Sequence, residues 1–452
     1  MHIKDETCNT TATSVHSNFF KPNESSFKHM KDTKIAVIGL GYVGLPLAIE
    51  FGKQYRTIGF DIKSHRIKEL NEGIDNTREV TSDDLKSASQ LTFTSVEDDI
   101  REANVYIVTV PTPIDDHRQP DLTPLVKASE LLGRVIDKGD IVIYESTVYP
   151  GATEEDCIPV VEQVSGLVFN QDFYAGYSPE RINPGDKERP VSKIMKVTSG
   201  STPEIAEFVD QLYKSIITAG TFKASSIKVA EASKIIENTQ RDVNIALINE
   251  LSMIFSHLNI DTHDVIEAAA TKWNFIKLQP GLVGGHCIGV DPYYLVHKSM
   301  SVGHIPDIIR KAREINDGMA RFVASKLIKA MIEKGQVIKD AKVLVLGMTF
   351  KENCPDIRNT KVIDLINELK SYSMNVDIYD PWVDPKEAEH EYGVSMVPNL
   401  NEGEYDAVII AVAHNEFKAL GYDGIYKLGK DVTTYLDMKN VLGDEGKDEV
   451  RL

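Results

Sequence analysis

The chain has 452 residues and few features that would place it in a specialised class of protein. Its cysteines number four, and none pairs with another at a metal-site or C-x-x-C spacing. So few cysteines in so long a chain make a disulfide framework implausible, and we expect reduced thiols and no metal site. The four are Cys8, Cys157, Cys287 and Cys354.

Long apolar runs and excess positive charge are also missing. No apolar stretch reaches the roughly 18 residues that a membrane helix needs, so no membrane span is expected. The net charge of −18 argues against nucleic acid or an anionic membrane as a partner. Residues 1–32 are polar and lack an apolar signal core, which favours a poorly ordered extension. Together these absences favour a cytoplasmic protein.

Strand and helix patterns alternate at both ends of the chain. Apolar strand-like runs occur at 34–38, 105–110 and 141–144, and again at 342–347 and 407–412. Residues 225–258 contain no Pro or Gly and carry apolar residues at three- and four-residue steps, which predicts one long helix. The fold class expected is therefore α/β, with two Rossmann-like doubly wound domains joined by a central helical domain. The predicted domains are 33–220, 221–335 and 336–452.

A dinucleotide fingerprint follows the first strand. Gly39, Gly41 and Gly44 fit G-x-G-x-x-G between a strand and a helix. In that pattern the glycines allow a tight turn, a close approach to a pyrophosphate and close helix packing, while the helix N-terminus favours the anion. Asp61 stands where a carboxylate would accept the ribose hydroxyls and repel a 2′-phosphate, so NAD is preferred to NADP. The alternative is a glycine-rich turn that binds nothing.

The segment 280–294, PGLVGGHCIGVDPYY, combines reactive and flexible residues. Cys287 lies among glycines and Asp291 follows four residues later. A lone cysteine is usually a small buried apolar residue, but this open, polar setting favours a nucleophile. In the long helix, Lys234 and Asn238 are four residues apart and share a face. On spacing alone they could be a solvated pair.

Two further fragments carry charge in predicted loops. Glu180 lies in GYSPERINPGD and is a candidate base, while Lys351 and Arg358 belong to FKENCPDIRN, after a strand of the second α/β unit. Cations at that place suit a phosphate. Each fragment alone would more often be a solvated charge.

Seven motifs in this order resemble the UDP-glucose/GDP-mannose dehydrogenase superfamily over essentially all of residues 33–452. Within it, the chain resembles the UDP-N-acetylhexosamine 6-dehydrogenases of bacterial surface-polysaccharide synthesis, of the Vi-antigen type. The motifs are VIGLGYVGLPLA, VPTP at 110–113, ESTVYPG at 145–151, SPER at 178–181, AEASKIIENT at 230–239, GGHCIGVDPYY at 284–294 and FKENCPDIRN at 350–359.

The resemblance implies a role for each matching position. Cys287 would be the nucleophile, Lys234 and Asn238 would stabilise an oxyanion, and Asp291 would hold a water for proton transfer. Glu180 would be the base for thioester hydrolysis, with Thr147 positioning the water. The cofactor site would comprise Gly39, Gly41, Tyr42, Val43, Gly44, Asp61, Arg66, Thr112, Thr147 and Arg358. The UDP-sugar would meet Glu180, Arg181, Lys234, Asn238, Gly284, Phe350 and Lys351.

The implied reaction oxidises C6 of a UDP-N-acetylhexosamine to a carboxylate with two NAD. UDP-GlcNAc is expected first and UDP-GalNAc next, with UDP-glucose, UDP-ManNAc or GDP-mannose as alternatives. The glucose-type members have one more residue between the Pro-containing turn and the cysteine, and tend to carry Glu where this chain has Pro184. These departures leave the chemistry intact but put the family's sugar contacts in doubt.

The residues fit such chemistry on their own terms. A thiolate can trap an aldehyde as a thiohemiacetal, whose oxidation gives a thioester that water cleaves. Lys234 and Asn238 can supply donors to the oxygen that gains charge. Two rivals remain: a two-electron hydroxyacid or hydroxyacyl-CoA dehydrogenase, and a non-catalytic NAD-binding regulator. The apolar content of the long helix further predicts a homodimer with the helical domain at the seam.

Overall fold

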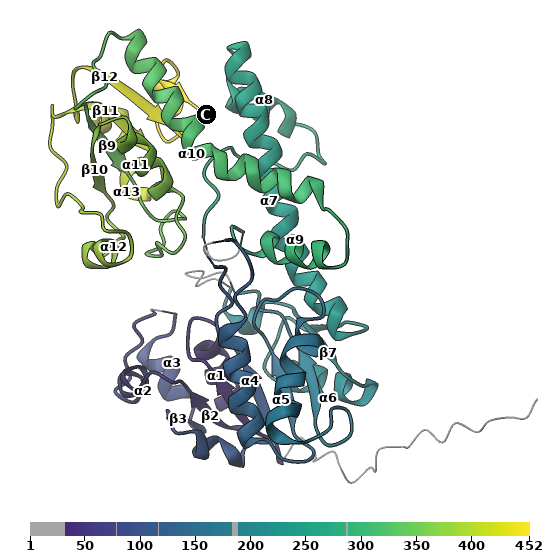
Figure 1. Cartoon of the computed structure of the whole chain (residues 1–452). Coiled ribbons are helices and arrows are strands. Elements are labelled where there is room, and N and C mark those ends of the chain that lie inside the picture. The colour runs from purple at the N-terminus through teal and green to yellow at the C-terminus, as the bar shows by residue number, and fades with distance from the viewer. Residues whose placement is uncertain (1–31, 78, 116, 183–188, 286–287) are drawn as a thin grey trace, which may run out of the picture.

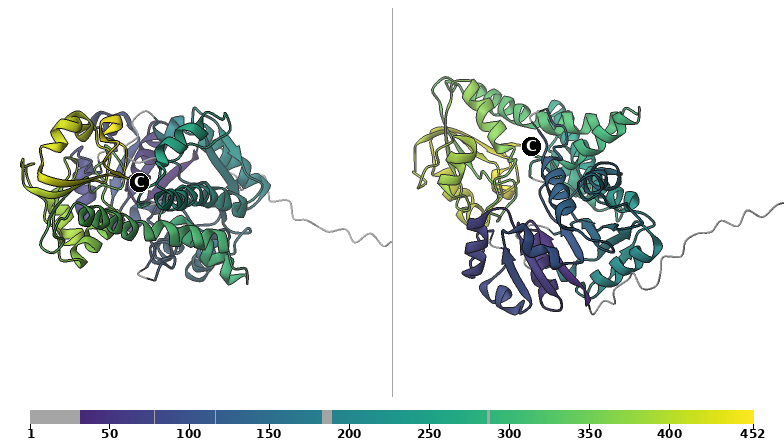
Figure 2. Two further views of the ribbon diagram at one scale, coloured as in Figure 1. Left: turned by 90° about the horizontal axis from the view of Figure 1, so that it is seen from above. Right: turned by 60° about the horizontal axis from the view of Figure 1, so that its bottom comes forward.

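A computed structural model describes residues 32–77, 79–115, 117–182, 189–285 and 288–452. Two α/β units lie at opposite ends of the chain, and a group of long helices lies beside both (Figure 1). The tilted view on the right of Figure 2 shows the two sheets apart from each other.

The N-terminal unit is an eight-stranded sheet with the order β3-β2-β1-β4-β5-β6-β7-β8. All neighbours are parallel except β6 and β7. The order reverses direction between β1 and β4, which creates the switch point at which such sheets bind ligands. The strands are β1 (Lys34–Ile38), β2 (Arg56–Phe60), β3 (Leu91–Thr94), β4 (Val105–Val108), β5 (Ile141–Tyr144), β6 (Tyr174–Tyr177), β7 (Lys196–Gly200) and β8 (Thr221–Lys223).

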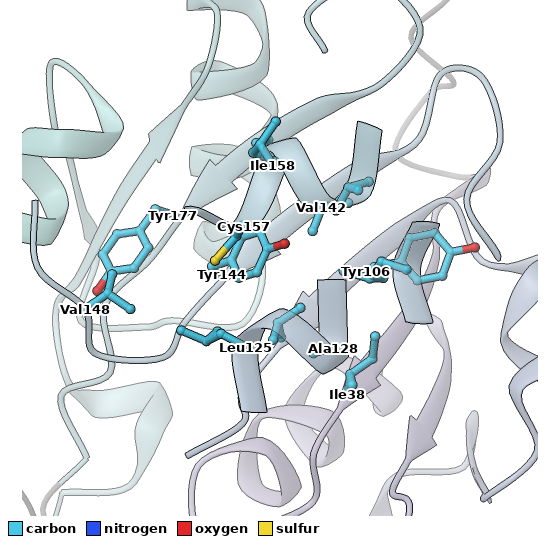
Figure 3. Packing of buried hydrophobic residues seen from close by; sticks show 14 of the residues in the cluster. Ile38, Tyr106, Leu125, Ala128, Val142, Tyr144, Val148, Cys157, Ile158 and Tyr177 are labelled. Carbon is cyan, nitrogen blue, oxygen red and sulfur yellow. The ribbon is translucent and has the colours of Figure 1, made fainter. Parts of the chain in front are cut away.

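Helices bury both faces of this sheet, which is why its central strands are continuous apolar runs. Helices α4 (Thr123–Val135) and α5 (Ile158–Ser165) share one core with the sheet, and α1 (Gly44–Gly52) and α6 (Pro203–Lys214) share the other. Figure 3 shows Cys157 packed among Tyr144, Val148 and Ile158 in the first core. The smaller helices are α2 (Ser64–Asn71) and α3 (Ser82–Ser87), with short 3-10 helices at Glu97–Glu102 and Val191–Lys193 and a π-helical segment at Thr153–Cys157.

The central part is built on α7 (Ile227–Leu258). Ser226 caps its N-terminus by accepting a hydrogen bond from the Val229 amide, and Asn259 ends it in the left-handed conformation. Helix α7 packs against α8 (Thr262–Ala270), α9 (Asp291–Ser301) and α10 (Asp307–Glu333). Helix α10 continues into the second α/β unit, where it packs against α11 (Val362–Ser371).

The C-terminal unit is a parallel five-stranded sheet with the order β10-β9-β11-β12-β13. Helices α10, α11 and α12 (Pro385–Tyr392) cover one face, and α13 (Asn415–Tyr426) covers the other. Its switch point lies between β9 and β11. The strands are β9 (Lys342–Leu346), β10 (Asn375–Tyr379), β11 (Tyr405–Ile410), β12 (Gly429–Asp437) and β13 (Val450–Arg451), with a turn at Gly443–Gly446.

The predicted fold class is therefore confirmed, long central helix included. Within the described ranges, no helix is both long and apolar enough to cross a membrane.

Candidate active site

The glycine turn after β1 has the geometry that a dinucleotide needs. Gly39 has a φ of +94°, and its amide donates to the Phe60 carbonyl at 2.8 Å, which fixes the turn. A Cβ on Gly44 would lie 1.9 Å from the Gly39 oxygen, so only glycine lets the helix approach this closely. A Cβ on Gly41 would meet nothing within 4 Å, which leaves room on the outer side of the turn. These residues fit a bound NAD pyrophosphate.

Asp61 lies just past β2 and is anchored by backbone amides. Its Oδ2 accepts from the Leu40 amide at 3.0 Å and its Oδ1 from the Lys63 amide at 2.9 Å. Each oxygen keeps a lone pair for a ribose hydroxyl. Arg66 was predicted at the cofactor, and its side chain lies behind the turn. It donates to the Leu40 carbonyl and pairs with Asp75 at 2.7 Å.

We expect Asp61→Ala to weaken NAD binding and to narrow the preference for NAD over NADP. The substitution removes the acceptor for the ribose hydroxyls and the charge that repels a 2′-phosphate. Titration of both cofactors against wild type and variant measures the effect. A wild type that binds NADP as well as NAD would contradict this role for Asp61.

Helix α7 presents a stripe of buried polar side chains that contact the N-terminal unit, α9 and α10 in turn along the helix. The members share one face, because they recur at intervals of three, four and seven residues along a helix of 3.6 residues per turn. They are Glu231, Lys234, Asn238, Asp242 and Asn249, all less than 9% exposed. The predicted pair Lys234 and Asn238 is thus buried, and the reading as a solvated pair is wrong.

Asp291, the first residue of α9, joins this stripe. Its Oδ2 accepts from Asn238 Nδ2 at 2.5 Å, and the carboxylate feels the charge of Lys234. Burial raises the pKa of Asp291 from 3.8 to about 6, although Lys234 and Asn238 both act to lower it. The carboxyl group can therefore exchange a proton near neutral pH, as an acid–base group must.

We expect Asp291→Asn to stabilise the fold while removing activity. The folded-state pKa lies above the unfolded value, so ionisation disfavours the fold, and the wild type loses stability as the pH rises from about 4 to about 6. The rise of the pKa from 3.8 to about 6 corresponds to a loss of about 3 kcal/mol in the free energy of unfolding at pH values above 6. Urea unfolding of both proteins across this pH range measures the difference between their free energies of unfolding. A difference that does not grow as the pH rises would contradict the burial of a titrating carboxyl group here.

Cys287 and His286 lie outside the described residues, and the segment before them is fixed by two domains. Asn249 on α7 binds both polar backbone atoms of Gly281, accepting from its amide at 2.8 Å and donating to its carbonyl at 3.1 Å. The Gly285 amide donates to the Asn359 carbonyl at 3.1 Å. A Cβ on Gly284 would lie 2.5 Å from that carbonyl, so the glycine permits the contact.

The C-terminal unit brings its predicted residues to the same region. A Cβ on Gly285 would lie 2.7 Å from the ring of Phe350, so this ring packs directly on the glycine segment. Arg358 pairs with Asp356 and stacks over the Tyr42 ring, 4.9 Å from its centroid. The glycine turn of one sheet thus meets the FKENCPDIRN loop that follows the first strand of the other.

Four more predicted residues lie past the carboxyl ends of β4, β5 and β6, while Val43 precedes α1 and Lys351 follows β9 in the other sheet. Thr112 is buried near α9, where the Tyr294 hydroxyl donates to the Pro113 carbonyl at 2.8 Å. Thr147 follows β5 and is half-buried, and Glu180 follows β6 and is buried. Arg181 pairs with Glu237 on α7 and donates to the Met195 carbonyl at 3.0 Å.

Several residues that hold this site were not predicted. Glu231 accepts from the amides of Gly151 at 2.5 Å and Thr153 at 2.9 Å, which ties α7 to the segment after Thr147. The sequence did hold a signal for Glu231, because it is a polar residue at helical spacing from Lys234 and Asn238.

The FKENCPDIRN loop is held by a buried histidine that was also not predicted. The Asn353 amide donates to Nδ1 of His414 at 2.9 Å, and Nε2 lies 3.1 Å from Asp380 and from Thr349. Asp380 also accepts from the Met348 amide, as Asp61 does from Leu40 in the other unit. His414 and Asp380 lie 34 positions apart in the sequence, so no local sequence pattern indicates that they meet.

A glycine turn that fits a dinucleotide, a second parallel sheet whose loop reaches that turn, and a buried Lys–Asn–Asp group together indicate a dehydrogenase with a second nucleotide-type domain. Residues 33–217 match the NAD binding domain of the UDP-glucose/GDP-mannose dehydrogenase family, 228–318 its central domain and 344–444 its UDP binding domain. The chain belongs to this family, and it is an NAD-dependent dehydrogenase.

Relatives with established names are similar over nearly the whole chain. A UDP-N-acetyl-D-glucosamine 6-dehydrogenase of Pseudomonas aeruginosa is 63% identical, covering 94% of this chain and 100% of the relative. The enzyme of that name from Salmonella typhi is 58% identical, covering 93% and 99%. The solved structure of UDP-D-ManNAc dehydrogenase from Pyrococcus horikoshii superimposes with a TM-score of 0.83 at 32% identity, covering 93% of this chain and 98% of that one.

Proposed function

We propose that the protein oxidises C6 of UDP-N-acetylglucosamine to the carboxylate in two NAD-dependent steps, in the synthesis of a surface polysaccharide in the cytoplasm. The names of the relatives at 63% and 58% identity support the sugar. The buried Lys234–Asn238–Asp291 group carries the chemistry, because it offers donors and a titrating carboxyl group four residues from Cys287.

The proposed reaction consumes one water and releases one carboxylate, two NADH and three protons for each sugar. NAD, when bound at the glycine turn, accepts a hydride in each oxidation. Cys287 adds to the C6 aldehyde, and the thiohemiacetal is oxidised to a thioester. Lys234 and Asn238 donate to the C6 oxygen as it gains charge. Water then attacks the carbonyl carbon, its proton passes to Glu180, the C–S bond breaks and the thiolate is restored.

A panel of nucleotide sugars tests the substrate. NADH formation is measured with UDP-GlcNAc, UDP-GalNAc, UDP-ManNAc and UDP-glucose at equal concentrations. We expect the highest kcat/KM with UDP-GlcNAc. A higher value with any other sugar would reassign the substrate and leave the four-electron chemistry standing.

We also propose that the protein is a homodimer joined along α7. On the face opposite the polar stripe, five apolar side chains are 46–59% exposed and fall on one narrow line of the helix. They are Val229, Ile236, Leu247, Ile254 and Leu258. An apolar line along a helix of 32 residues is typical of a seam with a second helix. A second copy of this chain supplies a matching helix, as closed two-fold assemblies require.

The double substitution Leu247→Glu/Ile254→Glu should convert the dimer into a monomer, because it places buried charge in the seam. Light scattering at micromolar concentration measures the mass. The control Val432→Glu alters a side chain that is also about half exposed, 55%, but lies in the C-terminal sheet. A wild-type monomer, or a double variant that remains dimeric, would contradict the seam.

A further inference from the structure

A buried charged cluster lies behind the site and joins three strands of the N-terminal sheet. Glu145 follows β5, Glu180 follows β6 and Lys196 begins β7. Their side chains are 0%, 9% and 2% exposed. Lys196 Nζ pairs with Glu145, donates to the Pro179 carbonyl at 3.0 Å and lies 3.6 Å from Glu180 Oε2. Two carboxylates thus share one ammonium in the sheet interior.

Glu180 is restrained from both of its oxygens. Oε1 accepts from the Ile182 amide, and Oε2 faces the Lys196 ammonium. The carboxylate is therefore oriented by an amide on one side and a cation on the other, with lone pairs left for a water. An exposed glutamate on a loop would have neither restraint.

Glu145 keeps the ammonium charged in this buried place. Burial alone would lower the pKa of Lys196, but the charges of Glu145 and Glu180 raise it above its ordinary value. Burial also raises the pKa of Glu145 to about 7, which Lys196 partly opposes. With both carboxylates ionised the cluster carries one excess negative charge, so a proton is taken up near neutral pH.

Other titratable groups near the cluster stay neutral or are paired. Tyr213 on α6 faces both carboxylates, with its ring centroid 5.8 Å from Lys196 Nζ. Tyr177 on β6 feels Glu145 together with Glu231 and Asp291. Burial raises the pKa of both phenols well above the ordinary value, so they remain neutral. Next to Glu180, Arg181 is paired with Glu237 on α7.

We propose that Lys196 and Glu145 are positioning residues for Glu180: the ammonium, anchored by Glu145, holds the Glu180 carboxylate oriented to take a proton from the water that cleaves the thioester. The inference deepens the proposed function and rests on its hydrolytic step. It adds two residues that act on the reaction through a third, Glu180.

The test compares two substitutions that change the charge facing Glu180 in opposite directions. Lys196→Met removes the cation that faces the Glu180 carboxylate, so the acid limb of the kcat–pH profile should move to higher pH by about one pH unit. Glu145→Gln removes the competing anion, which should move the same limb to lower pH. The second change is nearly isosteric. If the two residues had only a structural role, the acid limb would move in the same direction in both variants or would move in neither. Either result would overturn the inference.

The step that slows gives a second readout. Lys196→Met should slow hydrolysis about 10- to 100-fold, less than the roughly 100- to 10,000-fold that a positioned base contributes as a whole, because Glu180 itself is retained. The hydride steps should be little affected, so intact mass should show the sugar acyl group retained on the chain after NADH has formed. A defect in NADH formation itself would contradict the inference. If Lys196→Met does not fold, the inference is tested by Glu145→Gln alone, through the shift of the acid limb of its kcat–pH profile.

The profiles are measured with whichever sugar the wild type oxidises, so an error in the substrate leaves this test intact. A wild type that forms one NADH per sugar would remove the hydrolytic step, and the inference would fall with the proposed function. If the wild type forms two NADH per sugar but the acid limb moves in neither variant, the inference is overturned and the proposed function stands.

Discussion

Cys287→Ser should lose steady-state turnover by several orders of magnitude and still bind NAD and the nucleotide sugar. The serine keeps a hydroxyl at the position but is far harder to ionise near neutral pH than a thiol. An ester formed after the second oxidation would also be cleaved slowly. Turnover is followed by NADH absorbance, binding by calorimetry and the trapped ester by intact mass.

Cys157→Ala is the matched control for this substitution. Cys157 is buried in the core of the N-terminal sheet, where burial raises the pKa of its thiol to about 12. Its loss should lower stability by the cost of a small cavity and leave kcat near the wild-type value. If Cys287→Ser turned over at a near-normal rate, the thioester mechanism would have to be abandoned.

Lys234→Ala should lower kcat by about 100- to 1,000-fold, because the C6 oxygen loses its charged donor in the transition state. The thiol is retained, so iodoacetamide should still label Cys287, and slower labelling would show that the Lys234 ammonium favours the thiolate. Stopped-flow absorbance should place the defect in the first appearance of NADH.

Lys228→Ala is the control on the same helix. Its ammonium is about half exposed and pairs with Glu155 on the surface, so its loss should leave kcat nearly unchanged. Equal losses in the two variants would mean that α7 as a whole had been disturbed. A normal rate in Lys234→Ala would remove this lysine from the proposed mechanism.

The sequence predicted the elements that have strong local patterns. Residues 225–258 lack Pro and Gly and became α7 over Ile227–Leu258. The strand expected at 342–347 is β9, Lys342–Leu346, and the strand expected at 407–412 is β11, Tyr405–Ile410. The glycine turn and Asp61 were predictable because their spacing along the chain reflects a local backbone geometry.

The contacts that hold the site residues in place could not be predicted from local sequence patterns. Lys196 begins a short strand, KVTSG, which gives no sign that it meets Glu145. That contact depends on the antiparallel placement of β7 beside β6, which is a property of the whole sheet. Likewise, His414 and Asp380 meet only because β11 and β10 flank the same central strand. Burial then turns ordinary surface-type residues into a charged cluster.

The central claim is that one site oxidises one sugar twice. It is tested most directly by the amount of NADH formed when limiting UDP-GlcNAc is consumed to completion with excess NAD, with an aldehyde-trapping reagent present. We expect two NADH for each sugar, UDP-N-acetylglucosaminuronate as product and no trapped aldehyde. One NADH for each sugar, with an aldehyde recovered, would contradict it.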